Sequence, residues 1–390
     1  MLQQLKVLDF STLLPGPWAT MLLADMGADV LRVESSTRPD MLRTTGALLH
    51  GQSAAHLMIN RNKRSLALDL KSEAAATIIH ALIKDYDIII EQFRPGVMAR
   101  LGFDYDTLKA INPSIIYCSI TGYGQTGDYK QKAGHDINYQ AISGLASYSG
   151  RTETGPVLHG LPIADVAGGS HHAVMAILAA VIERQTTGEG RYLDISMTDA
   201  AFRMNGLFGA GALATGDDLG LSSELLNGGH IYDYYETADG RYLSIGSLEP
   251  QFARQLFEVL EQPSWLALAA SQEPSDIVSL KQQLAALIAQ QPLAHWVNLF
   301  NGTDCCVEPV LTFNEAADSD LMRQRDLLCD VELPQGEIIK QLSPFLAGSN
   351  VKTHDPGRQP GENTRDVLKA LDFSDATVNK WLESGAVTQF

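Results

Sequence analysis

Three polar residues at predicted loop and helix ends have side chains suited to acid–base or nucleophilic chemistry. They are His135 in Ala-Gly-His-Asp, Asp165 in Ile-Ala-Asp-Val-Ala-Gly-Gly, and Glu249 in Leu-Glu-Pro-Gln-Phe. Imidazole and carboxyl groups transfer protons when their surroundings tune them, and a carboxylate can also act as a nucleophile. Each residue has a structural alternative. Asp165 can cap the following helix, His135 can be a hydrogen-bonded structural histidine, and Glu249 can be an exposed residue at a helix start.

Other motifs fit their usual chemistry poorly. The run Gly122-Tyr-Gly-Gln-Thr-Gly127 matches a dinucleotide-binding pattern, but Asp-Tyr-Lys-Gln-Lys-Ala-Gly follows it instead of a helix start. The adjacent pairs His171-His172 and Cys305-Cys306 have a spacing that rarely lets both side chains face one metal ion. No G-x-S-x-G elbow occurs. The sequence therefore predicts no nucleotide fingerprint, no metal site and no serine nucleophile.

Composition limits the partners. Lys plus Arg number 29 against 46 Asp plus Glu, which gives a formal charge of −17 and argues against nucleic acid or an anionic membrane as the main partner. A local basic pocket could still bind a compact anion. The four cysteines contain no C-x-x-C pair, which favours a reducing cytosol and a cytoplasmic location. We expect no targeting segment and no membrane span.

The elements that must position these residues follow an alternating pattern. Short apolar runs rich in β-branched residues alternate with helix-period segments, which is typical of parallel strands joined by helices. Helices are predicted at 15–26 and 72–85, and a long buried helix with a glycine-rich first turn at 165–184. This pattern predicts an α/β fold with a mostly parallel sheet. The predicted strands are 6–10, 29–34, 65–70, 87–93, 114–121 and 191–197.

A change in amino-acid composition indicates a second domain. Gly and Ala become frequent at 206–227, and a hairpin around Asp239-Gly240 is predicted at 231–246. We predict a large domain from residues 1–205, a small domain from 206–330, and a C-terminal part, 331–390, that returns to the large domain.

Several ordered segments together resemble one known family over nearly the whole chain. They include Lys-Val-Leu-Asp-Phe near the start, Leu-Pro-Gly-Pro, Phe93-Arg-Pro-Gly-Val, Gly134-His-Asp-Ile-Asn-Tyr139 and Asp304-Cys-Cys-Val-Glu-Pro-Val-Leu311. This set resembles the family III CoA-transferase and α-methylacyl-CoA racemase (CaiB/BaiF) family. The resemblance implies a Rossmann-like large domain, a smaller α+β domain, and an interlocked homodimer whose active sites are shared between subunits.

The resemblance also implies roles for the three polar residues. The aspartate at the position of Asp165 is the catalytic residue shared by the family. Racemases resemble this chain in having a histidine 30 residues earlier, here His135, and a glutamate in Glu-Pro-Gln-Phe, here Glu249, that orients the histidine. Formyl-CoA transferase has a tyrosine at the histidine position.

Two activities follow from this comparison. In a racemase or epimerase, His135 and Asp165 would be two bases on opposite faces of the α-carbon of an acyl-CoA thioester, and N–H groups at Gly168 and Gly169 would stabilise the enolate. In a CoA-transferase, Asp165 would instead attack the thioester and form an aspartyl-CoA intermediate. We favour racemisation because the His, Asp and Glu set is complete.

The same resemblance implies how CoA is bound, as part of the substrate and not as a permanently held cofactor. Arg100 matches an arginine near the CoA phosphates, and its planar guanidinium suits phosphate contacts. Several relatives have an arginine where this chain has Ser35, which puts one nucleotide contact in doubt. The remaining positions matched to CoA binding are Leu68, Lys71, Phe93, Gly134 and Tyr139.

Overall fold

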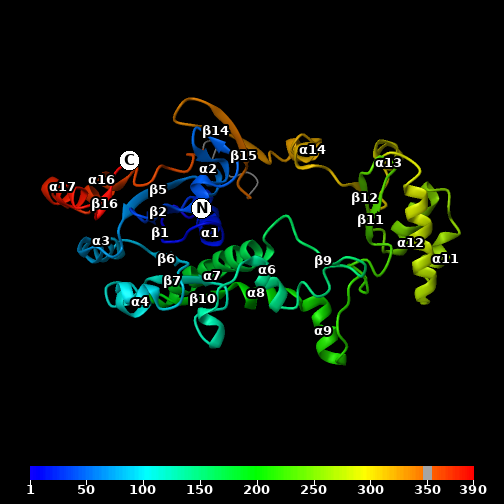
Figure 1. Ribbon diagram of the computed structural model, residues 1–390, viewed down its shortest axis with the longest axis horizontal. Coiled ribbons are helices and arrows are strands. Elements are labelled where there is room, and N and C mark those ends of the chain that lie inside the picture. Colours follow the sequence, from blue (N-terminus) through cyan, green and yellow to red (C-terminus); the bar gives the residue numbers. More distant parts are fainter. Residues whose placement is uncertain (346–353) are drawn as a thin grey trace. The chain divides into compact units, whose positions relative to one another are not determined.

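A seven-stranded sheet forms the centre of the computed structural model, which describes residues 1–345 and 354–390. The strand order is β10-β7-β6-β1-β2-β5-β16, and every neighbouring pair is parallel except β16 with β5. Successive strands run outward from β1 in both directions, so the strand order reverses between β1 and β6 (Figure 1). The strands are β1 (Lys6–Asp9), β2 (Asp29–Glu34), β5 (Lys63–Leu68), β6 (Ile88–Glu91), β7 (Ile116–Thr121), β10 (Tyr192–Ser196) and β16 (Val387–Thr388).

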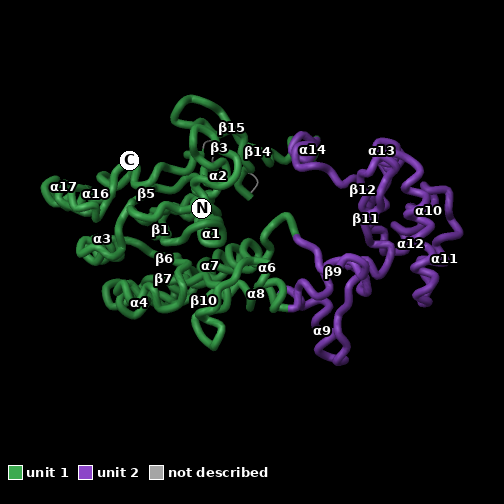
Figure 2. The backbone as a smooth tube through the Cα atoms, viewed as in Figure 1, with its two compact units in different colours: residues 1–143, 159–203, 320–390 green, residues 144–158, 204–319 purple. Residues whose placement is uncertain are grey.

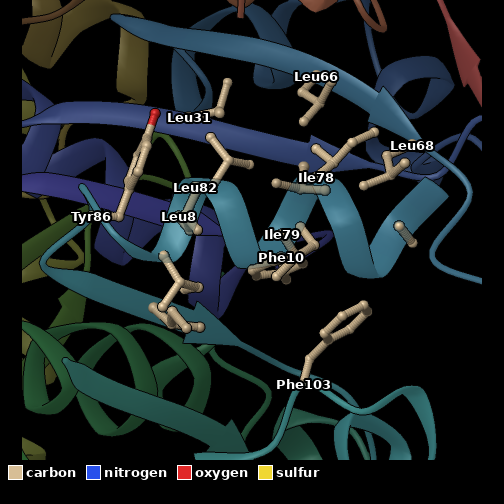
Figure 3. Close-up of a cluster of buried hydrophobic side chains, with 14 of the residues drawn as sticks. Leu8, Phe10, Leu31, Leu66, Leu68, Ile78, Ile79, Leu82, Tyr86 and Phe103 are labelled. Atoms are coloured by element: carbon tan, nitrogen blue, oxygen red, sulfur yellow. The ribbon is translucent and has the colours of Figure 1, made fainter. Parts of the chain in front are cut away.

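One face of this sheet is covered by an apolar helix and several shorter ones. The helix α3 (Glu73–Ile83) presents Ile78, Ile79 and Leu82 to strand residues such as Leu8 and Leu31, and all are almost fully buried (Figure 3). Burial of each such side chain contributes about 1.5–3 kcal/mol. The cluster also takes in residues of α4 (Val97–Leu101), α5 (Tyr105–Lys109), α16 (Thr364–Ala370) and α17 (Asp375–Glu383).

The opposite face carries α1 (Pro15–Asp25) and α7 (His172–Thr187), which contact each other. The π-helical segment η3 (Ala164–His171) leads directly into α7. Together, residues 164–187 form the one described helix that is long and apolar enough to cross a membrane, contrary to our expectation that none exists. Half of its most apolar window is buried within the protein, as in a core helix, so it is weak grounds for a membrane span.

A second compact unit has its own core. Its sheet order is β11-β12-β13, with both pairs antiparallel, and it packs against α10 and α12 around Leu256, Phe257 and Leu284. The predicted hairpin at 231–246 is present as β11 and β12. The elements are β11 (Asp233–Glu236), β12 (Tyr242–Ile245), β13 (Val307–Pro309), α10 (Pro250–Val259), α11 (Trp265–Ala269), α12 (Pro274–Ile288) and α13 (Leu293–Phe300).

The two units divide the chain somewhat differently from the predicted domains. Unit 1 comprises residues 1–143, 159–203 and 320–390, and unit 2 comprises 144–158 and 204–319 (Figure 2). The segment 144–158 joins unit 2 because Arg151 pairs with Asp233, and because Tyr148 donates to Asn205 at 2.8 Å. Contacts between residues so far apart in the chain produce no local sequence pattern from which this division could be predicted.

Short elements complete both units. In unit 1 they are η1 (Met41–Thr44), β3 (Leu48–Leu49), β4 (Gln52–Ser53), α2 (Ala54–Ile59), η2 (Asp128–Gln131), α6 (Asp136–Ile142), α15 (Asp320–Gln324), β14 (Leu328–Glu332) and β15 (Ile338–Leu342). In unit 2 they are β8 (Gly150–Arg151), β9 (Gly155–Pro156), α9 (Gly206–Thr215) and α14 (Phe313–Ala317), while α8 (Met197–Met204) ends at the boundary between the units.

Candidate active site

A cavity of about 460 Å³ opens in unit 1 at the carboxyl ends of the central strands. Its walls come from the segment after β1 (Leu13 to Pro15), the segment after β6 (Gln92 to Pro95) and the end of β7 (Ile120 to Tyr123). These are the strands on either side of the reversal in strand order, where open parallel sheets usually bind ligands. The topology therefore locates the cavity independently of any motif.

Asp165 lies in the first turn of η3 and lines this cavity. Its backbone N–H donates to the Asp136 carboxylate at 3.0 Å. Burial raises the pKa of the Asp165 carboxyl to about 6, with a further upward contribution from Asp136 and a downward one from His135. Asp165 is thus present in both protonation states near neutral pH, a property common among catalytic acids and bases.

His135 lines the same cavity from the N-terminal end of α6. Its backbone N–H donates to the Asn138 side chain at 3.0 Å, and the preceding carbonyl of Gly134 accepts a bond from the Tyr139 hydroxyl at 2.6 Å. A Cβ at Gly134 would lie 2.7 Å from the Tyr139 ring, and one at Gly122 would lie 2.5 Å from it. The ring therefore packs against two glycines, which fixes the backbone that carries His135.

Three cationic side chains also line the cavity: Arg94, Lys130 and Lys132. The Lys132 ammonium lies 4.7 Å from the centre of the Tyr129 ring, a cation–π distance. This is a local basic pocket on a strongly acidic chain, as composition allowed. None of these three residues was predicted to line the site. For the two lysines, nothing in the run Asp-Tyr-Lys-Gln-Lys distinguishes a lysine in a pocket from one on the surface.

The first wall of the cavity is held by a buried ionic network. Leu13 has a backbone φ of 60°, which a non-glycine residue rarely adopts, and its N–H donates to Asp40 at 3.1 Å. Asp40 also pairs with Arg32, and both side chains are 2% exposed. The carboxylate accepts a further bond from the Leu42 N–H at 2.9 Å. Asp40 thus joins the core of β2 to the cavity wall.

The second wall depends on residues at the end of β6. Gln92 accepts a bond from the Gly16 N–H at 2.9 Å and so connects the two walls. Glu91 accepts from the Phe93 N–H at 2.8 Å, and burial raises the pKa of the Glu91 carboxyl to about 7. A Cβ at Gly16 would lie 2.2 Å from the Ser11 side chain, so this position requires glycine.

The structure brings together five of the nine predicted site residues. Asp165, His135, Phe93, Gly134 and Tyr139 all line the cavity.

The CoA contacts proposed for the other three residues of unit 1 stay predictions, because those residues lie outside the cavity lining. Leu68 is fully buried at the end of β5, while Lys71 and Arg100 are exposed. Arg100 lies near the loop that follows β6, since a Cβ at Gly96 would lie 3.6 Å from its guanidinium. Ser35 accepts bonds from the N–H groups of Thr37 and Arg38, so its hydroxyl shapes the turn after β2.

Glu249 belongs to unit 2, where it occupies the position before α10. Its predicted pairing with His135 therefore stays a prediction.

The expected enolate site at Gly168 and Gly169 lacks support from the geometry. Helical structure begins at Ala164, so both glycines lie within it, and neither lines the cavity. A Cβ at Gly169 would lie 3.1 Å from Met197 and from Pro15, and one at Gly168 would lie 3.2 Å from the Met197 carbonyl. The glycines therefore permit close helix packing. Among the described residues, no group of three or more metal-ligating side chains is found.

Comparisons with known proteins identify the family of this chain. The model of CoA-transferase family III matches residues 2–364. The chain is 33% identical to human alpha-methylacyl-CoA racemase, over 96% of this chain and 94% of the racemase. It is 30% identical to human succinyl-CoA:glutarate CoA-transferase, over 100% of this chain and 90% of the transferase. The crystal structure of a CAIB/BAIF family protein from Brucella suis superposes with a TM-score of 0.80 at 28% identity, covering 95% of this chain and 99% of that one.

Proposed function

Because this chain belongs to CoA-transferase family III, we propose that it is an acyl-CoA racemase or epimerase that inverts the α-carbon of a 2-substituted acyl-CoA thioester. The observation that carries the proposal is that His135 and Asp165 line one cavity. Inversion requires a base on one face of the carbon and an acid on the other, and this pair provides both. Relatives include enzymes named for racemisation and for CoA transfer, so the family alone leaves the reaction open.

The proposed reaction moves one proton off the α-carbon and another onto it. In one direction, ionised Asp165 removes the α-proton, and the electron pair of the C–H bond moves into the thioester carbonyl to give an enolate. Protonated His135 then donates a proton to the opposite face of the carbon. In the other direction, neutral His135 is the base and protonated Asp165 is the acid, so Asp165 must be able to occupy both states.

The raised pKa of the Asp165 carboxyl supports this role. A carboxyl with its ordinary pKa near 4 would carry a proton in roughly one molecule in a thousand at pH 7. With a pKa of about 6, it carries a proton in roughly one molecule in ten. The direction that needs protonated Asp165 therefore gains about 100-fold in the population of competent enzyme.

The cationic lining supports binding of a CoA thioester. Arg94, Lys130 and Lys132 lie in the same cavity as the reacting pair. Guanidinium and ammonium groups bind phosphate oxygens strongly when partly desolvated. We propose that these three residues contact the phosphate-bearing part of the substrate, in addition to the predicted contact at Arg100.

CoA transfer is the second candidate, and a specific similarity favours it. The chain is also 30% identical to acetyl-CoA:oxalate CoA-transferase of Acetobacter aceti, over 92% of this chain. In that reaction the Asp165 carboxylate would attack the thioester carbonyl and displace CoA, giving a mixed anhydride. The CoA thiolate would then attack the Asp165 carbonyl of the anhydride and release the first acid as a carboxylate, which leaves an aspartyl-CoA thioester. A second carboxylate would attack this thioester and displace CoA, and the CoA thiolate would finally attack the new acyl group and release the Asp165 carboxylate.

One experiment separates the two reactions. A single enantiomer of a 2-methylacyl-CoA is incubated with the enzyme in deuterated water. A racemase incorporates deuterium at the α-carbon while optical purity is lost. The His135→Ala variant should lose most of the deuterium incorporation and most of the racemisation. Racemisation is refuted if the α-hydrogen and configuration persist while CoA moves to an added acid, and if hydroxylamine displaces CoA from Asp165 and leaves its hydroxamate, seen as a mass shift of that peptide.

We also propose a homodimer in the cytoplasm. The helix α9 has an apolar sequence, Gly-Leu-Phe-Gly-Ala-Gly-Ala-Leu-Ala-Thr, yet none of its residues is buried, and Leu207 and Leu213 are 71% and 82% exposed. Apolar surface of this kind marks protein interfaces. Sedimentation of the Leu207→Glu, Leu213→Glu variant should show monomers where the parent protein shows dimers. A cytoplasmic location is consistent with four cysteines that are all free.

A further inference from the structure

We propose that Asp136, which does not line the cavity, is a positioning residue that joins the two reacting side chains and controls when Asp165 carries a proton. The inference rests on the proposed roles of His135 and Asp165 in proton transfer. Asp136 is covalently adjacent to one member of the pair and hydrogen-bonded to the backbone of the other. It is not among the residues that line the cavity.

The Asp136 carboxylate is fixed at both oxygens. Its Oδ1 accepts the Asp165 N–H at 3.0 Å, and its Oδ2 accepts from the Gln140 amide at 2.5 Å. Gln140 is itself only 6% exposed and lies one turn further along α6. Such a carboxylate has little freedom to turn toward solvent.

The bond to Asp165 meets a need created by the helix. N–H groups in the first turn of a helix have no partner within it, and here the Asp165 N–H finds one in Asp136, 29 residues earlier. A carboxylate at this end of a helix is also stabilised by the aligned peptide dipoles. The contact therefore connects the start of α6 to the start of η3, and with them His135 to Asp165.

The charge of Asp136 acts on the same residue. A nearby negative charge disfavours ionisation of a carboxyl, so Asp136 raises the pKa of Asp165, after burial as the first cause. His135 acts in the opposite direction and lowers the pKa of the Asp165 carboxyl. The charged and titratable groups around Asp165 are His135 and Asp136 at the start of α6, Tyr139 within α6, Tyr123, Arg94, Lys130 and Lys132 in the cavity lining, and His171 at the far end of η3.

The Asp136→Asn variant separates the charge from the hydrogen bond. Asparagine keeps an oxygen for the Asp165 N–H, and the Gln140 amide can turn to accept from the new amide group. Asp136→Ala removes both the charge and the acceptor. Asp128→Asn is the matched control, because it removes one negative charge from η2 at an exposed position that makes no contribution to the pKa of Asp165.

The direct measurement is the pH dependence of carbodiimide labelling at Asp165, followed by peptide mass spectrometry, since the reagent reacts with protonated carboxyl groups. We expect the labelling midpoint to move to lower pH by roughly 0.5–1 unit in Asp136→Asn and to stay in place in Asp128→Asn. The acidic limb of the kcat/KM profile should move the same way for both enantiomers. For Asp136→Ala we expect kcat to fall about 10- to 100-fold with a smaller change in KM, because the pair loses its alignment.

The outcomes distinguish this inference from the proposed function. An unchanged labelling midpoint in Asp136→Asn, or an equal shift in Asp128→Asn, overturns the inference even if the enzyme racemises its substrate. If the protein proves to transfer CoA instead, the labelling shift still tests the effect of Asp136 on Asp165. Circular dichroism of each variant identifies any loss of fold, and a folded Asp136→Ala enzyme with full kcat refutes the positioning role.

Discussion

Replacing Asp40 by alanine should destabilise unit 1 by about 3–5 kcal/mol, because it leaves a buried charge without its partner. The Arg32 side chain is 2% exposed, and its Nε and Nη1 have no hydrogen-bond partner within the described residues. Without Asp40, the nearest counter-charge is Glu34 at 3.5 Å, which already pairs with Arg43 at 2.6 Å. The N–H groups of Leu13 and Leu42 lose their acceptor at the same time.

Asp40→Asn tests the charge alone. The amide oxygen can still accept from one backbone N–H, so the loss should be smaller, about 1–3 kcal/mol. A matched surface control is Asp330→Ala, which breaks an ion pair with Lys340 whose side chains are 63% and 70% exposed. That change should cost about 0.5 kcal/mol or less.

Hydrogen exchange measured by mass spectrometry suits a protein with two units, because a single unfolding transition cannot be assumed. In Asp40→Ala, we expect amides of β2 to exchange about 10²- to 10⁴-fold faster, while amides of β11 and β12 in unit 2 keep their rates. KM for the acyl-CoA should also rise, since Leu13 can relax from its φ of 60° and move the cavity wall. If β2 exchange rises less than tenfold, the buried pair does not stabilise unit 1 as reasoned.

Three further predictions concern the cavity. Gly134→Ala should lower kcat at least tenfold, measured as deuterium incorporation, because the new methyl group would meet the Tyr139 ring and displace His135. Lys132→Gln should raise KM for the acyl-CoA several-fold with little change in kcat, and the salt dependence of KM should weaken. Asp165→Asn should abolish activity yet stabilise the protein by about 1–3 kcal/mol at pH 7.5. The gain arises because the pKa of the Asp165 carboxyl in the folded protein is raised to about 6. The parent protein therefore loses stability as the pH rises from about 4 to about 6. Thermal unfolding of the two proteins should therefore differ at pH 7.5 and converge near pH 4.

The central sheet was predictable because its strands are short apolar runs with helices between them. The predicted strand at 29–34 coincides with β2, and that at 65–70 is offset by two residues from β5. The offset arises because Lys63 looks like a surface residue but is 3% exposed, held by Asn60 at 2.9 Å and by Asp9. Strands are predicted from runs of apolar residues, so a strand that begins with a buried lysine is predicted to start too late.

The site was predictable only where a single residue type carries the chemistry. His135 and Asp165, which line one cavity, were predicted from their types and from the family resemblance. Asp136 was not, although it stands beside His135, because its bond to Asp165 spans 29 residues. The expected role of the N–H groups at Gly168 and Gly169 lacks support for a related reason: a glycine pair suggests an open helix start, but here it permits close packing against Met197.

The strand β16 has a consequence for how the chain folds during synthesis. It pairs with β5, and Val387, opposite Leu68, is fully buried. The ribosome must therefore release residues 387–388 before the sheet of unit 1 can be completed, whereas the core of unit 2 between Ile231 and Cys305 can form earlier. Until then, β5 presents an unpaired edge to other nascent chains, so chaperone binding is expected to protect this edge during synthesis.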